Sequence, residues 1–102
     1  MTIIKLISEH IEDETEDAVT YGKMAVEYKD TYPELAAVFD KLSHDESHHA
    51  ELLHEQVVGF IKKHRETNGE PPASMMAVYD HLHKKDIERM GEAKRYWEMF
   101  RN

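Results

Sequence analysis

The sequence predicts an all-α protein built from three long helices in one domain, residues 1–102. Apolar residues recur at steps of three and four through most of the chain, which is the period of an amphipathic helix. The three prolines stand at only two places, Pro33 and Pro71–Pro72, and divide the chain into three segments. A composition of 33% charged and 40% hydrophobic residues suits a soluble helical protein of this length.

The first segment predicts a helix over about residues 3–30. Its apolar seam keeps alternating steps of three and four, apart from one gap at Glu14. After it, Thr31 and Glu34 have the spacing of a capping box, and Pro33 suits a first helical turn. The seam consists of Ile4, Ile7, Ile11, Ala18, Tyr21, Ala25 and Tyr28.

The second and third helices are predicted over residues 33–67 and 73–101. Asn68–Gly69 ends the second helix as a left-handed cap, and the two prolines prevent its continuation. Short loops favour antiparallel packing of consecutive helices. The second seam contains Leu35, Val38, Phe39, Leu42, Leu53, Val57, Phe60 and Ile61, and the third contains Met75, Met76, Tyr79, Leu82, Met90, Ala93, Tyr96, Trp97 and Phe100.

Three polar residues interrupt the first two seams where burial is expected. Glu14 fills the gap in the first helix, and Glu46 and His49 fill the gap in the second. The two positions are similarly far from the 31–33 turn, so an antiparallel pair places them level. A buried unpaired carboxylate is costly, so we predict a metal site here. A buried polar layer that fixes helix register is the alternative.

The spacing Glu-x-x-His is weak evidence alone, because Glu51 and His54 repeat it; we interpret that second pair as exposed. His83 and Asp86 could add a ligand pair, although a salt bridge or a surface position is favoured. Three further sets of residues are most simply solvated. His44 and His48 could instead chelate a surface ion, and Asp17 could support the metal ligands. The charged stripe could guide iron towards the site; it consists of His10, Glu12, Asp13 and Glu16.

The residues around these positions resemble the ferritin-like superfamily, most closely rubrerythrins and the short encapsulated ferritins. The resemblance rests on Glu14-x-x-x-Ala18-x-x-Tyr21-x-x-x-Ala25, on Pro33–Phe39 and on Asp45–Ala50, within about residues 10–60. It implies iron bound by Glu14, Glu46 and His49, with manganese or zinc as other ions that such a site accepts. It also implies a Tyr21 hydrogen bond near the site, which we weigh equally with a plain core tyrosine.

The chain departs from these families because it has no fourth helix and no second Glu-x-x-His in residues 73–101. Two copies would supply four carboxylates and two histidines, the full di-iron set. We therefore expect the first two helices to form a half-bundle that dimerises into a four-helix bundle, with the metals at the interface. Larger homo-oligomers fit the same reasoning, and the third helix would pack outside the bundle or exchange with a partner.

The formal charge of −8 disfavours nucleic acid, and no apolar run suggests a membrane span or a signal peptide. The absence of cysteine excludes disulfides, thiolate metal sites and a rubredoxin-like domain, and it fits a cytoplasmic location.

The leading functional hypothesis is a di-iron protein that oxidises Fe(II) with dioxygen or peroxide, in which Glu14, Glu46, His49 and Tyr21 form the reactive site. A helical structural or adaptor protein with a structural or vestigial metal site is the alternative. A third interpretation is a zinc or nickel buffer made of surface histidines.

Overall fold

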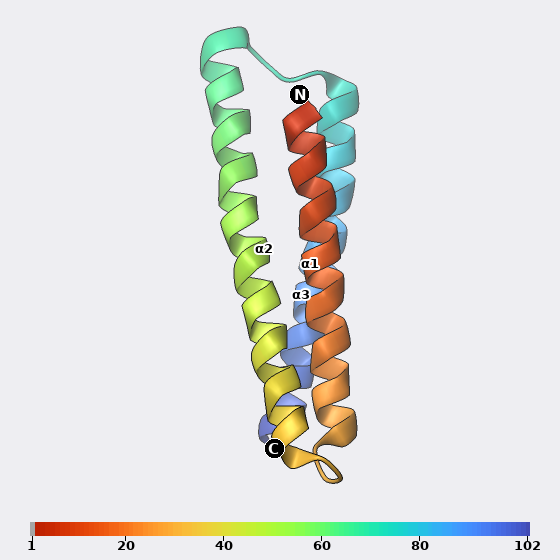
Figure 1. Cartoon of the computed structure of the whole chain (residues 1–102). Helices are drawn as coiled ribbons and strands as arrows, with labels where there is room; N and C mark the ends of the chain where they lie inside the picture. The colour runs from red at the N-terminus through yellow and green to blue at the C-terminus, as the bar shows by residue number, and fades with distance from the viewer. Residues whose placement is uncertain (1) are drawn as a thin grey trace.

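Three helices, each antiparallel to the next one along the chain, form an elongated molecule of 55 × 18 × 18 Å. The computed structural model describes residues 2–102, apart from the side chain of Thr2. The helices are α1 (Thr2–Tyr28), α2 (Pro33–Asn68) and α3 (Ala73–Arg101), which confirms the all-α prediction (Figure 1). No helix in residues 2–102 combines the length and the apolar character that a membrane span requires.

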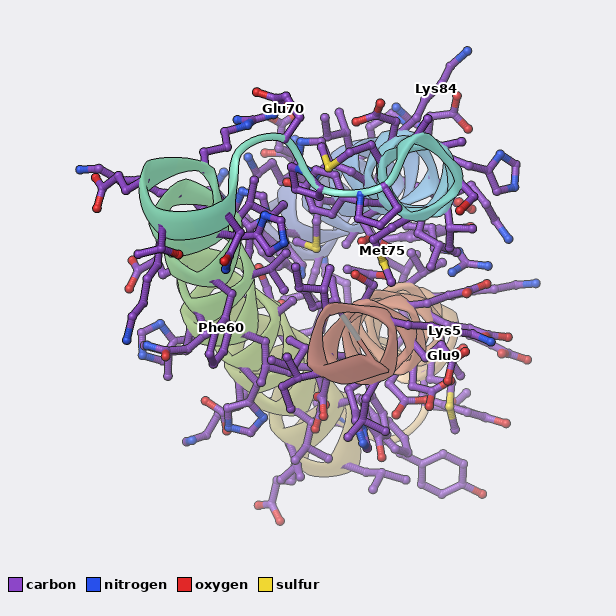
Figure 2. All side chains as sticks on the ribbon, turned by 90° about the horizontal axis from the view of Figure 1, so that it is seen from above. Lys5, Glu9, Phe60, Glu70, Met75 and Lys84 are labelled. Carbon is purple, nitrogen blue, oxygen red and sulfur yellow. The ribbon has the colours of Figure 1, made fainter. Side chains whose placement is uncertain are left out.

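Helix α1 is the central element. Both α2 and α3 pack along it, whereas α2 and α3 make few direct contacts with each other. Seen along the long axis, α2 and α3 lie on different sides of α1 (Figure 2). The side chains of Lys5, Glu9 and Lys84 project outward. The third helix therefore packs on α1 of its own chain.

The main core joins α1 to α2. Its buried cluster consists of Ile4, Ile11, Ala50, Val57 and Ile61. Burial of each large aliphatic side chain contributes about 1.5–3 kcal/mol. Four further buried alanines, at positions 18, 25, 36 and 93, let the helices approach closely where larger side chains would separate them.

The contact between α1 and α3 includes a close approach at Gly22. An added Cβ there would lie 3.2 Å from Tyr96 Cβ and 3.3 Å from Ser43 Oγ. Beside it, Trp97 Nε1 donates to Ser43 Oγ at 2.7 Å, and that hydroxyl donates to the Ala18 carbonyl oxygen at 2.6 Å. These two hydrogen bonds link all three helices.

A charged contact also joins α1 and α3. Lys85 Nζ lies 2.9 Å from Glu12 Oε1, and Arg89 donates to the Glu12 carbonyl oxygen at 3.3 Å. The hydrogen bond from Lys85 holds the pKa of Glu12 below its usual value. The prediction that Glu12 is a solvated acid was wrong, because α3 packs over this part of α1.

The helix ends differ in detail from the sequence prediction. α1 ends at Tyr28, two residues before Asp30, and α2 includes Asn68. The predicted Thr31 cap was wrong: Tyr32 is the N-cap residue of α2 and makes no side-chain capping hydrogen bond. Pro33 does occupy the first turn, where its missing N–H costs little. Gly69 has the predicted positive φ, at 76°.

One predicted seam lies partly outside the core. Leu35 and Phe60 of α2 are 45% and 39% exposed, and Leu42 and Leu53 are half-buried. The reason is the position of α3, which meets α1 at Glu12, Thr15 and Gly22 and so leaves another face of the α1–α2 pair uncovered. We call the residues of α2 on this face the uncovered stripe: Leu35, Leu42, Glu46, His49, Leu53 and Phe60.

Candidate metal centre

Glu14, Glu46 and His49 meet on the uncovered face of the α1–α2 pair. His49 Nδ1 lies 3.5 Å from Glu14 Oε2 and 3.8 Å from Glu46 Oε2. One oxygen or nitrogen atom from each residue lies within 4.8 Å of the others, and this is the only such group of three in the described residues. The sequence prediction that these side chains come together is confirmed.

The antiparallel turn produces this arrangement. α1 and α2 fold back on each other at residues 29–32, so positions about equally far from the turn come level. Glu46 and His49 are one helical turn apart and therefore lie on the same side of α2. Glu14 reaches them from α1, one residue before Thr15, which faces α3.

The three side chains are less buried than the sequence suggested. Glu14 and Glu46 side chains are 26% and 19% exposed, and His49 is 54% exposed. The inward orientation predicted for His49 was wrong within a single chain, because none of the three described helices covers this face. The site is open on the side where a second molecule could approach.

The chemistry of the group fits a divalent cation. Glu14 Oε2 is buried and has no hydrogen-bond partner among the described residues. A buried carboxylate oxygen without a partner costs free energy, and a bound cation would remove that cost. Two carboxylates with one imidazole suit iron or manganese, and they also accept zinc. The residues present therefore fit the metal that the sequence predicted.

Tyr21 lies two turns after Glu14 on α1. Its half-buried ring stacks on Phe39 of α2, with centroids 6.1 Å apart and planes 19° apart. Tyr28 also approaches Phe39, at 6.4 Å. These aromatic contacts hold α1 and α2 together between the site and the turn, so Tyr21 packs as a tyrosine of the helix contact.

The remaining candidates are placed as follows. Asp17 and His48 are exposed, as predicted. His44 is also exposed, and its ring stacks on Trp97 at 3.8 Å. Asp86 is neither in a salt bridge nor on the surface: it is 8% exposed and accepts a hydrogen bond from Thr15 at 3.3 Å.

Sequence reasoning missed His54. It was interpreted as exposed with Glu51, but it is half-buried and its ring stacks on His83 of α3, with centroids 4.7 Å apart. The Glu-x-x-His spacing marked the residue, but its burial depends on where α3 packs, which the periodicity of α2 does not encode.

A comparison with known families agrees with the fold. A profile of the rubrerythrin family matches residues 5–102, almost the whole chain. The chain matches no curated protein and no solved structure. The family match extends the resemblance seen around the two helices to α3. The chain therefore belongs to the rubrerythrin family.

Proposed function

We propose that this protein binds iron at Glu14, Glu46 and His49 and oxidises Fe(II). The observation that carries the proposal is the convergence of these three side chains around an unpartnered, buried Glu14 oxygen. Membership of the rubrerythrin family supports the choice of iron. Manganese and zinc are further ions that the same donor set accepts.

One chain holds half of a di-iron ligand set. In carboxylate-bridged di-iron bundles, two helices each give a glutamate and two others each give Glu-x-x-His. Glu14 with Glu46 and His49 is one half of that set. A two-fold homodimer, or a larger ring built from such dimers, would supply the other half.

The uncovered face supports this dimer. Leu35 and Phe60 on α2 and Ile3 and Leu6 on α1 are all 39–49% exposed, although they are large apolar residues. The uncovered stripe places Leu35 and Leu42 on one side of the metal ligands and Leu53 and Phe60 on the other. Pairing of two such faces would bury this apolar surface and the exposed His49 together.

Each ligand has a part in the proposal. Glu46 and Glu14 would hold the iron through their carboxylate oxygens, and His49 would hold it through an imidazole nitrogen. The negative charges of four carboxylates would offset the cationic charge and favour the ferric state. Bound iron supplies the redox chemistry: each Fe(II) gives up one electron, which dioxygen or hydrogen peroxide accepts.

The test is anaerobic loading with Fe(II) followed by exposure to air, in the wild type, Glu46→Ala and the control Glu66→Ala. Glu66 is an exposed glutamate on the same helix. We expect about one iron per chain and fast growth of ferric absorbance in the wild type and the control. Glu46→Ala should lose both. Equally slow oxidation in all three proteins would contradict the proposal.

A structural role for the same metal is the second candidate. Exposed apolar residues on α3 favour it, because an adaptor could offer Val78, Ile87 and Met99 to a partner. A structural ion should raise the melting temperature without supporting oxidation of Fe(II). Measurement of both quantities on one sample separates the two candidates.

A further inference from the structure

A cavity separates α2 from α3 on the side of the molecule away from Glu14. Its volume is about 540 Å³, and side chains of all three helices line it. Ile11 and Thr15 of α1 form part of the lining, between the walls made by α2 and α3. The cavity exists because α2 and α3 both pack on α1 but make few contacts with each other.

Two carboxylate–histidine pairs face each other across this cavity. Glu51 and His54 are one turn apart on α2, and His83 and Asp86 are one turn apart on α3; all four line the cavity. The His54 and His83 rings lie 4.7 Å apart with planes only 9° apart. The Tyr79 ring also stacks with His83, with centroids 5.5 Å apart. The two imidazoles are thus the main link between α2 and α3 at this level.

Burial shifts the pKa values of two of these groups. Burial, and then the neighbouring His83, lower the pKa of His54 below its usual value, which favours the neutral ring. Burial raises the pKa of Asp86, although Thr15 donates a hydrogen bond to it. A cation between the helices would favour the charged form of Asp86 and offset its burial.

We propose that His54 and His83 bind a second divalent metal ion between α2 and α3, with Asp86 as the nearest buried carboxylate and Glu51 at the rim. Two imidazoles and a carboxylate suit zinc, which takes nitrogen and oxygen ligands in tetrahedral geometry. The stacked rings must turn about their Cβ–Cγ bonds so that one nitrogen of each points to the same place. The cavity beside them gives room for this turn and for water ligands.

This site is separate from the iron site in place and in character. Glu14, Glu46 and His49 lie on the uncovered face, whereas His54 and His83 lie where α3 faces α2. A metal ion here would cross-link two helices that otherwise contact each other little. Its role is to fix α3 on the α1–α2 pair.

The test uses Zn²⁺ as the probe in a full-length protein that carries Glu46→Gln and His49→Gln, which disable the first site. Into this parent we introduce His54→Ala, His83→Ala or the control His81→Ala, an exposed histidine on the same helix as His83. Calorimetric titration should give one Zn²⁺ per chain in the parent and in the control. Each of the other two variants should bind at least about tenfold more weakly, because one of two imidazole ligands is gone.

Nuclear magnetic resonance of the histidine rings in the parent gives a readout that does not depend on whether a variant folds. Addition of Zn²⁺ should move the ring signals of His54 and His83. Unmoved His54 and His83 signals, or zinc binding as tight in His54→Ala and His83→Ala as in the parent, would overturn the proposal and assign the ion to surface histidines.

Discussion

At the scale of single residues, the carboxylate of Glu14 is the clearest indication of a bound cation. Its Oε2 atom is buried without a hydrogen-bond partner, yet His49 and Glu46 stand close to it. Such an arrangement costs free energy in the metal-free chain, and a bound cation would offset that cost. The position of Glu14 was predictable, because it interrupts an otherwise regular apolar seam. The exposure of His49 was not, since it depends on which face α3 leaves open.

Replacement of Glu14 by glutamine should therefore separate folding from metal binding. Without metal, Glu14→Gln should be as stable as the wild type or more stable by about 1 kcal/mol, since a buried charge is removed and an amide donor is gained. With Fe(II) under anaerobic conditions, the variant should lose the rise in melting temperature that the wild type shows. Melting curves with a chelator and with Fe(II) measure both effects. The control is Glu16→Gln, an exposed acid on the same helix, which should behave as wild type.

At the scale of elements, the periodicity of the sequence predicted three helices and the antiparallel pairing of α1 with α2. It did not predict how α3 packs. α1 has apolar or small residues over a broad arc, including Ile4, Ile11 and Gly22, and so offers faces to two helices. A seam alone cannot show which face each neighbour takes. The same uncertainty explains the errors at Glu12 and His54, which α3 covers or contacts.

Replacement of two glycines by alanine should have opposite effects on stability, because only Gly22 lies in the contact of α1 with α3. Gly22→Ala should destabilise the protein by about 1–3 kcal/mol, because the new methyl group meets the Tyr96 Cβ and Ser43 in a packed contact. Gly59→Ala meets nothing within 4 Å and should stabilise α2 by about 0.5–1 kcal/mol through helix propensity. Urea unfolding of both variants measures the difference. Stabilisation by Gly22→Ala would show that α3 does not pack on α1 in this way.

The contact of α2 with α3 predicts that the stability of the folded chain depends on pH. The pKa of His54 is lower in the folded chain than its usual value of 6.5, so its contribution to stability is present above pH 6.5 and is lost as pH falls through the folded value. Between pH 7 and pH 5, metal-free wild type should therefore lose more stability than His54→Gln. Urea midpoints at the two pH values, with a chelator present, give the comparison. Equal losses would mean that His54 is not buried against His83.

At the scale of the whole molecule, an elongated three-helix chain with one uncovered face accounts for the place of the candidate metal centre and for the proposed dimer. The chain brings together two carboxylates and one imidazole, but this face carries them beside exposed apolar residues. The sequence indicated the half-site through the absence of a second Glu-x-x-His in residues 73–101. The central claim is that two copies pair through the uncovered face and share the iron.

The measurement that tests this claim most directly is native mass spectrometry after anaerobic addition of Fe(II), for the wild type, Leu35→Lys and Val58→Lys. Leu35 and Val58 are both 45% exposed on α2, but only Leu35 belongs to the uncovered stripe. The wild type and Val58→Lys should appear as dimers, or multiples of dimers, with two irons per pair of chains. Leu35→Lys should shift to monomers with little iron. Wild-type monomers that each hold their own iron, or an unchanged assembly in Leu35→Lys, would contradict the account.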